Sequence, residues 1–287
     1  MNWIVYHIAS GHSFFSGLAL VMVAVALAAW NHPVAKRLVA ISLLVGLIAI
    51  LVSSTAIAYW YYGVMALTLV VWLCSPFKPE WRRKASIAVI VSCVVAAALE
   101  LPYHLTPRPS PTAPAAIAVI GDSVTAGVGS GDSQTWPKLL SDQRGIAVQD
   151  ISHMGDTAAS ALKRAKKQSI TAPLVFIEIG GNDLLGTTSA AEFERDLDAL
   201  LTHLRAPNRQ LLMLELPLPP FCHEYGRVQR KLARQHQVKL IPKRVFLNIL
   251  AGNEATLDTI HLSQAGHERM AECVWQLIQP AFPNHKG

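Results

Sequence analysis

Charged residues are scarce in this sequence, and the scarcity is uneven. Asp, Glu, Lys and Arg make up 15% of the 287 residues, whereas soluble globular domains average about 25%. Residues 1–100 hold only six Lys or Arg and two Asp or Glu, and no charged residue precedes Lys36. The first third of the chain therefore lacks the surface of an ordinary soluble domain.

Clustered basic residues, metal-ligand spacings and obvious cysteine pairs are lacking as well. The one dense basic run of the second part, residues 163–167, has no interleaved aromatic residue, so we expect a solvated helix face and no nucleic-acid partner. No Cys or His spacing resembles a metal site, and we expect no metal or other cofactor. Cys74 and Cys93 fall in apolar runs, while a bridge between Cys222 and Cys273 stays open.

Long apolar runs occupy residues 1–101. The run from Phe14 to Trp30 is long enough to cross a bilayer. Between Arg37 and Lys78 lie 40 uncharged residues, which as one helix would be about 60 Å long, twice the hydrocarbon thickness. They must fold back, and the polar residues 53–55 are the natural break. We predict a four-helix transmembrane region over residues 1–101, with spans near 14–30, 38–52, 58–74 and 85–101.

The basic residues between these runs predict the orientation. Lys36 and Arg37 follow the first span, and Lys78 with residues 82–84 follows the third. Both loops belong on the cytoplasmic side, because Lys and Arg accumulate there. A cleaved signal peptide is disfavoured, since the charges follow the apolar run instead of preceding it. We expect a multi-pass protein of the cytoplasmic (inner) membrane, with the remainder on the periplasmic or extracellular side.

After the membrane region the sequence changes character twice. Five prolines between residues 102 and 114 predict a stiff, extended linker that reaches at most about 40 Å. From residue 115 to residue 287, short apolar runs alternate with helical patterns, which predicts an α/β domain with a parallel sheet covered on both faces. The expected strands are 115–120, 146–151, 174–179, 211–216 and 238–241, and the expected helices are 136–143, 157–167, 190–204 and 224–236.

Chemically distinctive residues follow the expected strands. Ligands bind at the carboxyl ends of parallel strands, so we expect these residues to share one edge of the sheet. A second Gly-Asp-Ser triplet, Gly131-Asp132-Ser133, has no strand before it and is expected to be loop. The residues at strand ends are Gly121-Asp122-Ser123, then Gly155, then Gly180-Gly181-Asn182-Asp183, and Asp258-Thr259-Ile260-His261 stands near the C-terminus.

These four blocks, in this order, resemble those of the SGNH (GDSL-type) hydrolase family. The resemblance covers residues 117 to about 280 and is closest to small bacterial esterases, thioesterases and lysophospholipases. It implies a three-layer, flavodoxin-like α/β fold and hydrolysis of acyl esters or thioesters through a serine acyl-enzyme, without a metal. The Gly-x-Ser-x-Gly motif of α/β-hydrolases is absent. The membrane region lies outside the resemblance.

Elementary chemistry assigns roles to the same residues. Ser123 is a weak nucleophile that needs a base, which His261 can supply, and Asp258 would orient the imidazole. The backbone N–H groups of Ser123 and Gly155 and the Asn182 amide could stabilise the oxyanion. Asp122 and Asp183 are expected to be structural hydrogen bonders. Four apolar residues after strand ends could line an acyl pocket or belong to the core: Leu184, Leu185, Leu218 and Phe221.

The sequence therefore predicts a membrane-anchored serine esterase acting on lipid or lysophospholipid esters or thioesters at the outer face of the membrane. Two alternatives stay open. One is an O-acetylesterase or acyltransferase that acts on envelope glycans, and the other is a non-catalytic membrane assembly protein. The expected partners are an acyl ester and the lipid bilayer; the sequence says nothing about the oligomeric state.

Overall fold

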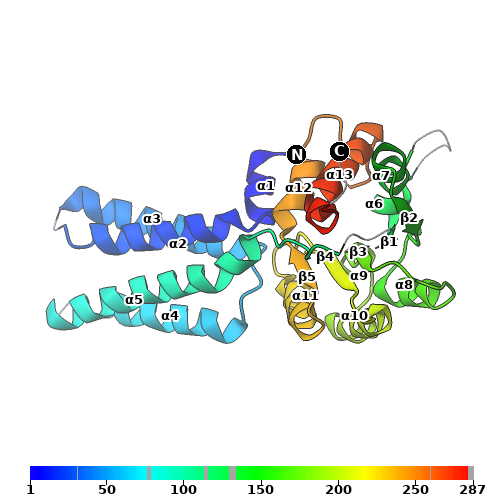
Figure 1. Ribbon diagram of the computed structural model, residues 1–287. Coiled ribbons are helices and arrows are strands. Elements are labelled where there is room, and N and C mark those ends of the chain that lie inside the picture. The colour runs from blue at the N-terminus through cyan, green and yellow to red at the C-terminus, as the bar shows by residue number, and fades with distance from the viewer. Residues whose placement is uncertain (31, 76–78, 113–115, 129–133, 259, 284–287) are drawn as a thin grey trace. The chain divides into compact units, whose positions relative to one another are not determined.

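The computed structural model describes residues 1–30, 32–75, 79–112, 116–128, 134–258 and 260–283 (Figure 1). The chain divides into two compact units. The helical unit comprises Trp3–His104 and Leu218–His223, and the α/β unit comprises Met1–Asn2, Leu105–Pro217 and Glu224–Gly287. The prediction of apolar helices followed by an α/β domain is confirmed.

A five-stranded, wholly parallel sheet forms the centre of the α/β unit, with strand order β2-β1-β3-β4-β5. This is the flavodoxin-like order, in which ligands bind at the carboxyl edge where β1 and β3 meet, because the chain winds away from that point in both directions. Each strand falls within or beside a predicted one: β1 (Ala116–Gly121), β2 (Ala147–Asp150), β3 (Leu174–Glu178), β4 (Gln210–Leu214) and β5 (Lys239–Ile241).

Helices cover both faces of the sheet (Figure 1). On one face lie α7 (Trp136–Arg144), α12 (Lys243–Leu250) and α13 (Gln264–Ile278), followed by the short η2 (Gln279–Ala281). On the other lie α8 (Ala158–Ala165), α10 (Ala190–Leu204) and α11 (His223–Gln235). Two further short helices, α6 (Ser123–Ala126) and α9 (Gly181–Leu185), begin where β1 and β3 end.

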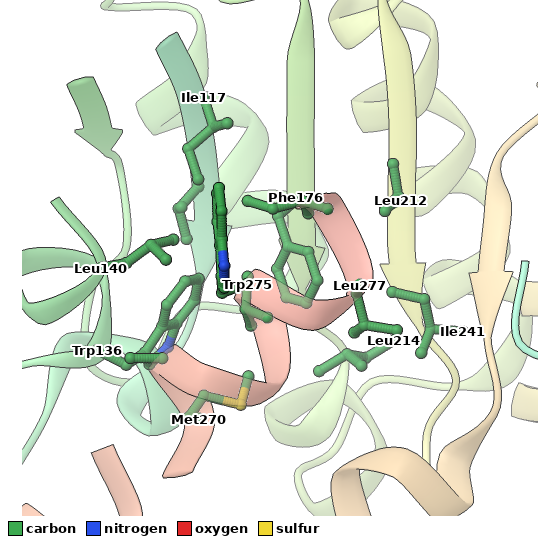
Figure 2. Packing of buried hydrophobic residues seen from close by; sticks show 14 of the residues in the cluster. Ile117, Trp136, Leu140, Phe176, Leu212, Leu214, Ile241, Met270, Trp275 and Leu277 are labelled. Carbon is green, nitrogen blue, oxygen red and sulfur yellow. The ribbon is translucent and has the colours of Figure 1, made fainter. Parts of the chain in front are cut away.

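Large buried side chains join the sheet to α7 and α13 (Figure 2). Trp136 of α7 meets Phe176 of β3 edge to face, with ring centroids 5.6 Å apart, and both are fully buried. Met270 and Trp275 of α13 complete the cluster. Since truncating a buried aromatic residue typically costs about 3–5 kcal/mol, this layer holds the sheet edge in place.

The helical unit holds α1 (Trp3–Ala9), α2 (His12–Leu27), α3 (Pro33–Val52), α4 (Tyr59–Leu73), α5 (Pro79–Glu100) and η1 (Leu101–His104). Figure 1 shows α2 beside α3 and α4 beside α5. Gly17 and Gly46 let α2 and α3 touch, because a Cβ on Gly17 would lie 2.6 Å from the Gly46 carbonyl oxygen. Such small residues are typical of helix contacts in membranes.

Two helices among the described residues have the length and apolar character of a membrane span, Pro33–Val52 and Glu80–His104. The pair Trp3–Ala9 and His12–Leu27 passes the same criterion only together and is bent by 88°. The helix Tyr59–Leu73 is apolar but has 15 residues. The helix α1 was not predicted, and the count of four spans stays a prediction.

The chain between Val52 and Tyr59 is not helical, and Ser53, Ser54 and Thr55 are completely buried in the helical unit. Ser53 Oγ and Thr55 Oγ1 lie 3.0 Å apart, within hydrogen-bond distance. The predicted break between the second and third apolar runs is thus a folded polar element inside an apolar unit.

The residues predicted to form a linker, 102–114, are divided between the two units. The first of them lie in η1, and from Leu105 the chain belongs to the α/β unit. Ser110 exchanges two hydrogen bonds with the Gln210 side chain, at 2.7 and 2.8 Å. Thr112 N donates to the Ala281 carbonyl oxygen at 3.1 Å. Residues 106–112 form neither helix nor strand, and these hydrogen bonds hold them along the α/β unit. The stiff spacer stays a prediction.

Candidate active site

Ser123 stands on the turn that leaves β1. Asp122 caps the short helix α6, since its Oδ1 accepts a hydrogen bond from Val124 N at 3.0 Å. The residue before Asp122 must be glycine, because a Cβ at Gly121 would lie 2.4 Å from Thr125 Oγ1. The strand, the tight turn and the cap together fix Ser123 at the carboxyl edge of the sheet.

His261 lies between Ser123 and Asp258. Its Nε2 is 3.2 Å from Ser123 Oγ, and its Nδ1 is 2.7 Å from Asp258 Oδ2. Because an ionised carboxylate only accepts hydrogen bonds, Nδ1 carries the proton and Nε2 presents a lone pair to the serine hydroxyl. The structure thus brings together the three residues predicted to be catalytic, in the geometry of a nucleophile, a base and an orienting acid.

Asp258 is held in its ionised form. The hydrogen bond from His261 and those from the backbone N–H groups of Ile260 and His261 keep the pKa of the Asp258 carboxyl well below its usual range. These backbone bonds are 2.7 and 2.8 Å long. The carboxylate therefore keeps its charge and its orientation at any pH at which the imidazole acts as a base.

Asn182 follows β3 on the short helix α9, at the neighbouring strand end. Its Nδ2 donates to the carbonyl oxygen of Asp156 at 3.0 Å and to Asp122 Oδ2 at 3.2 Å. The structure therefore brings Asn182 together with the turn Gly155–Asp156 that follows β2. Gly155 has a φ of +77°, a conformation that glycine adopts without strain. The oxyanion roles of Ser123 N, Gly155 N and Asn182 stay predictions.

Comparison with known proteins agrees with this arrangement. Residues 119–269, which contain the three candidate catalytic residues, match the GDSL-like Lipase/Acylhydrolase family. The chain belongs to this family. It is an acyl hydrolase of the SGNH esterase type, as the four sequence blocks indicate.

The relatives of this GDSL-type hydrolase include bacterial esterases. Esterase TesA of Pseudomonas aeruginosa is 32% identical over 180 residues, which cover 57% of this chain and 88% of the relative. Thioesterase 1/protease 1/lysophospholipase L1 of Escherichia coli is 29% identical over 178 residues, covering 59% and 85%. The crystal structure of TesA, at 29% identity, covers 58% of this chain and 99% of its own, with a TM-score of 0.52.

The N-terminal part of the chain is similar to a second family. Residues 10–138 match the TraX protein family. This match covers most of the helical unit and extends into the first part of the α/β unit. Together with the apolar helices it suggests that the GDSL-type hydrolase is associated with a membrane.

Asp122 has a buried acidic neighbour, Glu178, which the sequence pattern did not predict to belong to the site. Glu178, the last residue of β3, accepts hydrogen bonds from Thr125 Oγ1 at 2.8 Å and from Asp122 N at 3.4 Å. Burial and the neighbouring Asp122 charge raise the pKa of Glu178 well above its usual range. Burial likewise raises the pKa of Asp122 to about 6. The two buried carboxyl groups thus raise each other's cost of ionisation, and Glu178 is the one whose pKa is raised further above its usual range.

Asp156, also missed, anchors the turn that Asn182 contacts. Its carboxylate is buried and accepts hydrogen bonds from Arg164 Nε at 3.0 Å and Ser160 Oγ at 2.8 Å, both on α8. Asp183 is buried too, and its Oδ2 accepts from Ala158 N at 2.9 Å. A sequence signal existed for Glu178 and Asp183, because a lone acidic residue within or directly after an apolar strand must be paired or protonated.

The four predicted pocket residues are divided between the two units. Leu184 and Leu185 lie on α9 next to Asn182, and Leu185 is 63% exposed. Leu218 and Phe221 belong to the helical unit, where Leu218 is 2% exposed and Phe221 is 74% exposed. Leu218 is thus buried whereas Leu185 and Phe221 are exposed, and the assignment of the four residues to an acyl pocket stays a prediction.

Three further predictions concern the cysteines, the second Gly-Asp-Ser triplet and metal binding. All four cysteines are free, so Cys222 and Cys273 are not bridged. The second triplet, Gly131-Asp132-Ser133, lies outside the described residues. No group of three or more His, Cys, Asp or Glu suited to a metal ion occurs in the part of the chain that the structure describes.

Proposed function

We propose that this GDSL-type hydrolase is a membrane-anchored serine esterase that cleaves acyl esters or thioesters of lipids at the outer face of the membrane. The observation that carries the chemical part is the position of His261, 3.2 Å from Ser123 Oγ and 2.7 Å from Asp258 Oδ2. A neutral imidazole held between a hydroxyl and a carboxylate is the arrangement that activates a serine.

The reaction follows from this geometry. His261 Nε2 takes the proton of Ser123 as Oγ attacks the acyl carbonyl carbon, and Asp258 stabilises the imidazolium that forms. The imidazolium then gives its proton to the departing alcohol or thiol, which leaves Ser123 acylated. Water attacks this ester with His261 again as base, and the proton returned to Oγ regenerates the serine and releases the carboxylic acid.

The tetrahedral intermediate needs hydrogen-bond donors for its negatively charged oxygen. Asn182 is placed for this role at the point where β1 and β3 meet, where its Nδ2 donates to Asp122 Oδ2 and Asp156 O. Because an amide nitrogen has two N–H donors, one of these hydrogen bonds has to open when the amide turns to the oxyanion. The Ser123 and Gly155 N–H groups would complete the set.

The membrane part of the proposal rests on the helical unit. Apolar helices and the likeness to the TraX family support membrane association. The basic residues Lys36, Arg37 and residues 82–84 lie in the first turns of α3 and α5 and support a cytoplasmic location for the N-terminal ends of these two helices. With four spans, the α/β unit is then outside the cytoplasm. The similarity to Esterase TesA and to Thioesterase 1/protease 1/lysophospholipase L1 supports an acyl ester of a lipid as the substrate.

Labelling with a fluorophosphonate tests the catalytic assignment directly. The wild-type protein should be labelled on Ser123, and Ser123→Ala should lose the label and lower ester turnover by about 10⁴ or more. Ser133→Ala is the matched control, since Ser133 stands in the second Gly-Asp-Ser triplet, and it should keep both. Equal losses in the two variants would mean that the nucleophile has been assigned to the wrong Gly-Asp-Ser triplet.

A further inference from the structure

We propose that the α/β unit binds a phosphate group in a basic pocket at the amino edge of its sheet, the edge at which the strands begin. The pocket has a volume of about 340 Å³. Small-molecule sites commonly have about 300–1,000 Å³, so this one suits a compact ligand. The lining residues that matter here are Arg205, Arg209, Gln210, His236 and Lys239.

The basic pocket lies away from the catalytic residues. Gln210 and Lys239 are the first residues of β4 and β5, whereas Ser123 follows the last residue of β1. Because the strands are all parallel, the two places are at opposite edges of the sheet, about 17 Å apart along a strand of five residues. The ligand of the basic pocket is therefore not the ester that Ser123 attacks, and the proposal does not depend on the proposed function.

Three positive charges line the basic pocket, and no acidic residue does. Arg205 is exposed, while Arg209 and Lys239 are partly buried. None of the three forms an ion pair with another residue in the part of the chain that the structure describes. Asp198 lies 2.6 Å from the lining residue His236, but it is not itself part of the lining. The lining thus has an excess of positive charge.

Arg209 is held in place with its charge uncompensated. Its Nε and Nη1 donate to the carbonyl oxygens of Ala172 and Leu204 at 2.9 and 2.8 Å, and its Nη2 donates to that of Ile170. Burial lowers the pKa of the Arg209 guanidinium, whereas an aspartate neighbour raises the pKa of Arg164. A guanidinium in a protein stays protonated all the same. An anion beside Arg209 would therefore stabilise a charge that burial destabilises.

Two helix ends account for part of the positive charge. The helix α10 ends at Leu204 and α11 ends at Gln235, each next to a lining residue. The terminal carbonyl groups of a helix carry about half an elementary negative charge, so two helix ends offset about one of the three positive charges. The excess of about two matches a phosphate group, which carries about −1.5 to −2 charges at pH 7. Arginine and lysine are also the side chains that commonly bind phosphate.

The test measures the binding of radiolabelled inorganic phosphate to the full-length protein in detergent micelles, by equilibrium dialysis at constant ionic strength. The wild type should bind one phosphate per chain. Arg205→Gln and Lys239→Gln should each weaken binding at least about tenfold, because each removes one charged hydrogen-bond donor. Arg209 is left intact, since its loss would also release three backbone carbonyl groups.

The matched control is Lys167→Gln. It removes one positive charge from the exposed basic run at residues 163–167, which does not line the basic pocket, and it should leave the Kd for phosphate unchanged. Thermal melting shows whether each variant is folded. If Lys167→Gln weakened binding as much as Lys239→Gln, phosphate would be attracted by net charge alone, and the proposal would be overturned.

A competition experiment distinguishes the two sources of a phosphate group. Glycerol 3-phosphate in solution and phosphatidic acid in phosphatidylcholine vesicles each compete with the radiolabelled phosphate. Displacement by the soluble ester at lower concentration would support a free phosphate compound as the ligand, and displacement by phosphatidic acid at lower concentration would support a lipid headgroup. The absence of saturable binding of inorganic phosphate to the wild type would contradict the proposal.

Discussion

The Asn182 side chain donates a hydrogen bond to the Asp122 carboxylate, so the residue before the candidate nucleophile orients the candidate oxyanion donor. The two residues follow β1 and β3, the adjacent strands at the switch point of the sheet. The carboxyl group of Glu178 accepts a hydrogen bond from Asp122 N, and the pKa values of both carboxyl groups are raised by burial. The three residues form one connected unit, and the following predictions separate their contributions.

Asn182→Ala should lower kcat on a short soluble ester by about 10²–10³ with little change in KM, because one donor to the oxyanion is lost. Steady-state kinetics on a p-nitrophenyl ester measure both constants. Asp183→Ala is the control one residue away: it removes the buried acceptor of Ala158 N and should lower stability by about 1–3 kcal/mol. If Asn182→Ala raised KM and left kcat unchanged, the side chain would bind substrate and not the oxyanion.

Glu178→Gln should change how stability depends on pH. Because the folded-state pKa of Glu178 is raised, its contribution is complete below its ordinary pKa of about 4.3 and is lost as pH rises through the folded value. Glutamine cannot ionise, and its carbonyl oxygen can still accept from Thr125 Oγ1. The Tm difference between the variant and the wild type should therefore grow in favour of the variant from about pH 5 upward. Parallel Tm curves would show that the carboxyl pair holds no proton.

The chain-length preference tests the exposed apolar residues that the sequence predicted to bind the acyl chain. Leu185→Ser should reduce kcat/KM for octanoyl esters relative to acetyl esters by about tenfold, since burying a leucine against an acyl chain contributes about 1.5–3 kcal/mol. Phe221→Ser should act in the same direction if the segment Leu218–His223 presents its ring to the substrate. Leu105, also 63% exposed, provides the matched control Leu105→Ser. If the preference for octanoyl over acetyl esters were the same in all three variants, Leu185 and Phe221 would not belong to the acyl site.

Membrane topology is predicted by the basic residues alone. A reporter fused after Gly287 should be active outside the cytoplasm, and one inserted near Glu80 should be active inside. Enzymatic reporters that work on one side only make the comparison. Two active reporters on the same side would mean that α5 does not cross the membrane, and exchanged sides would reverse the orientation.

The sequence predicted the features that depend on residues close together in the chain. Alternating apolar runs located all five strands, and the position of Ser123 directly after one of them distinguished it from Ser133. Three of the four blocks follow strands, which predicted that Ser123 and Asn182 share the carboxyl edge of the sheet. The meeting of Ser123 with Asp258 and His261 was implied by the resemblance to the family, because no strand precedes those two residues.

The features that were missed depend on tertiary contacts. Glu178 occupies an apolar strand because Thr125 Oγ1 and Asp122 N, more than 50 residues earlier, both donate hydrogen bonds to its carboxyl group. Leu218 looks like a loop residue of the α/β domain, yet Ser54 holds its backbone within the helical unit, 164 residues away in sequence. The helix α1 was missed because the seven residues Trp3–Ala9 are too short to show a helical period clearly.

Trapping the acyl-enzyme tests the central claim most directly. The full-length protein is mixed with vesicles containing a palmitoyl ester, quenched in acid during turnover, digested and analysed by mass spectrometry. We predict that the peptide containing Ser123 gains the mass of one palmitoyl group, and that Ser123→Ala shows no such peptide and no turnover. An acyl group on another residue, or undiminished turnover by Ser123→Ala, would contradict the account.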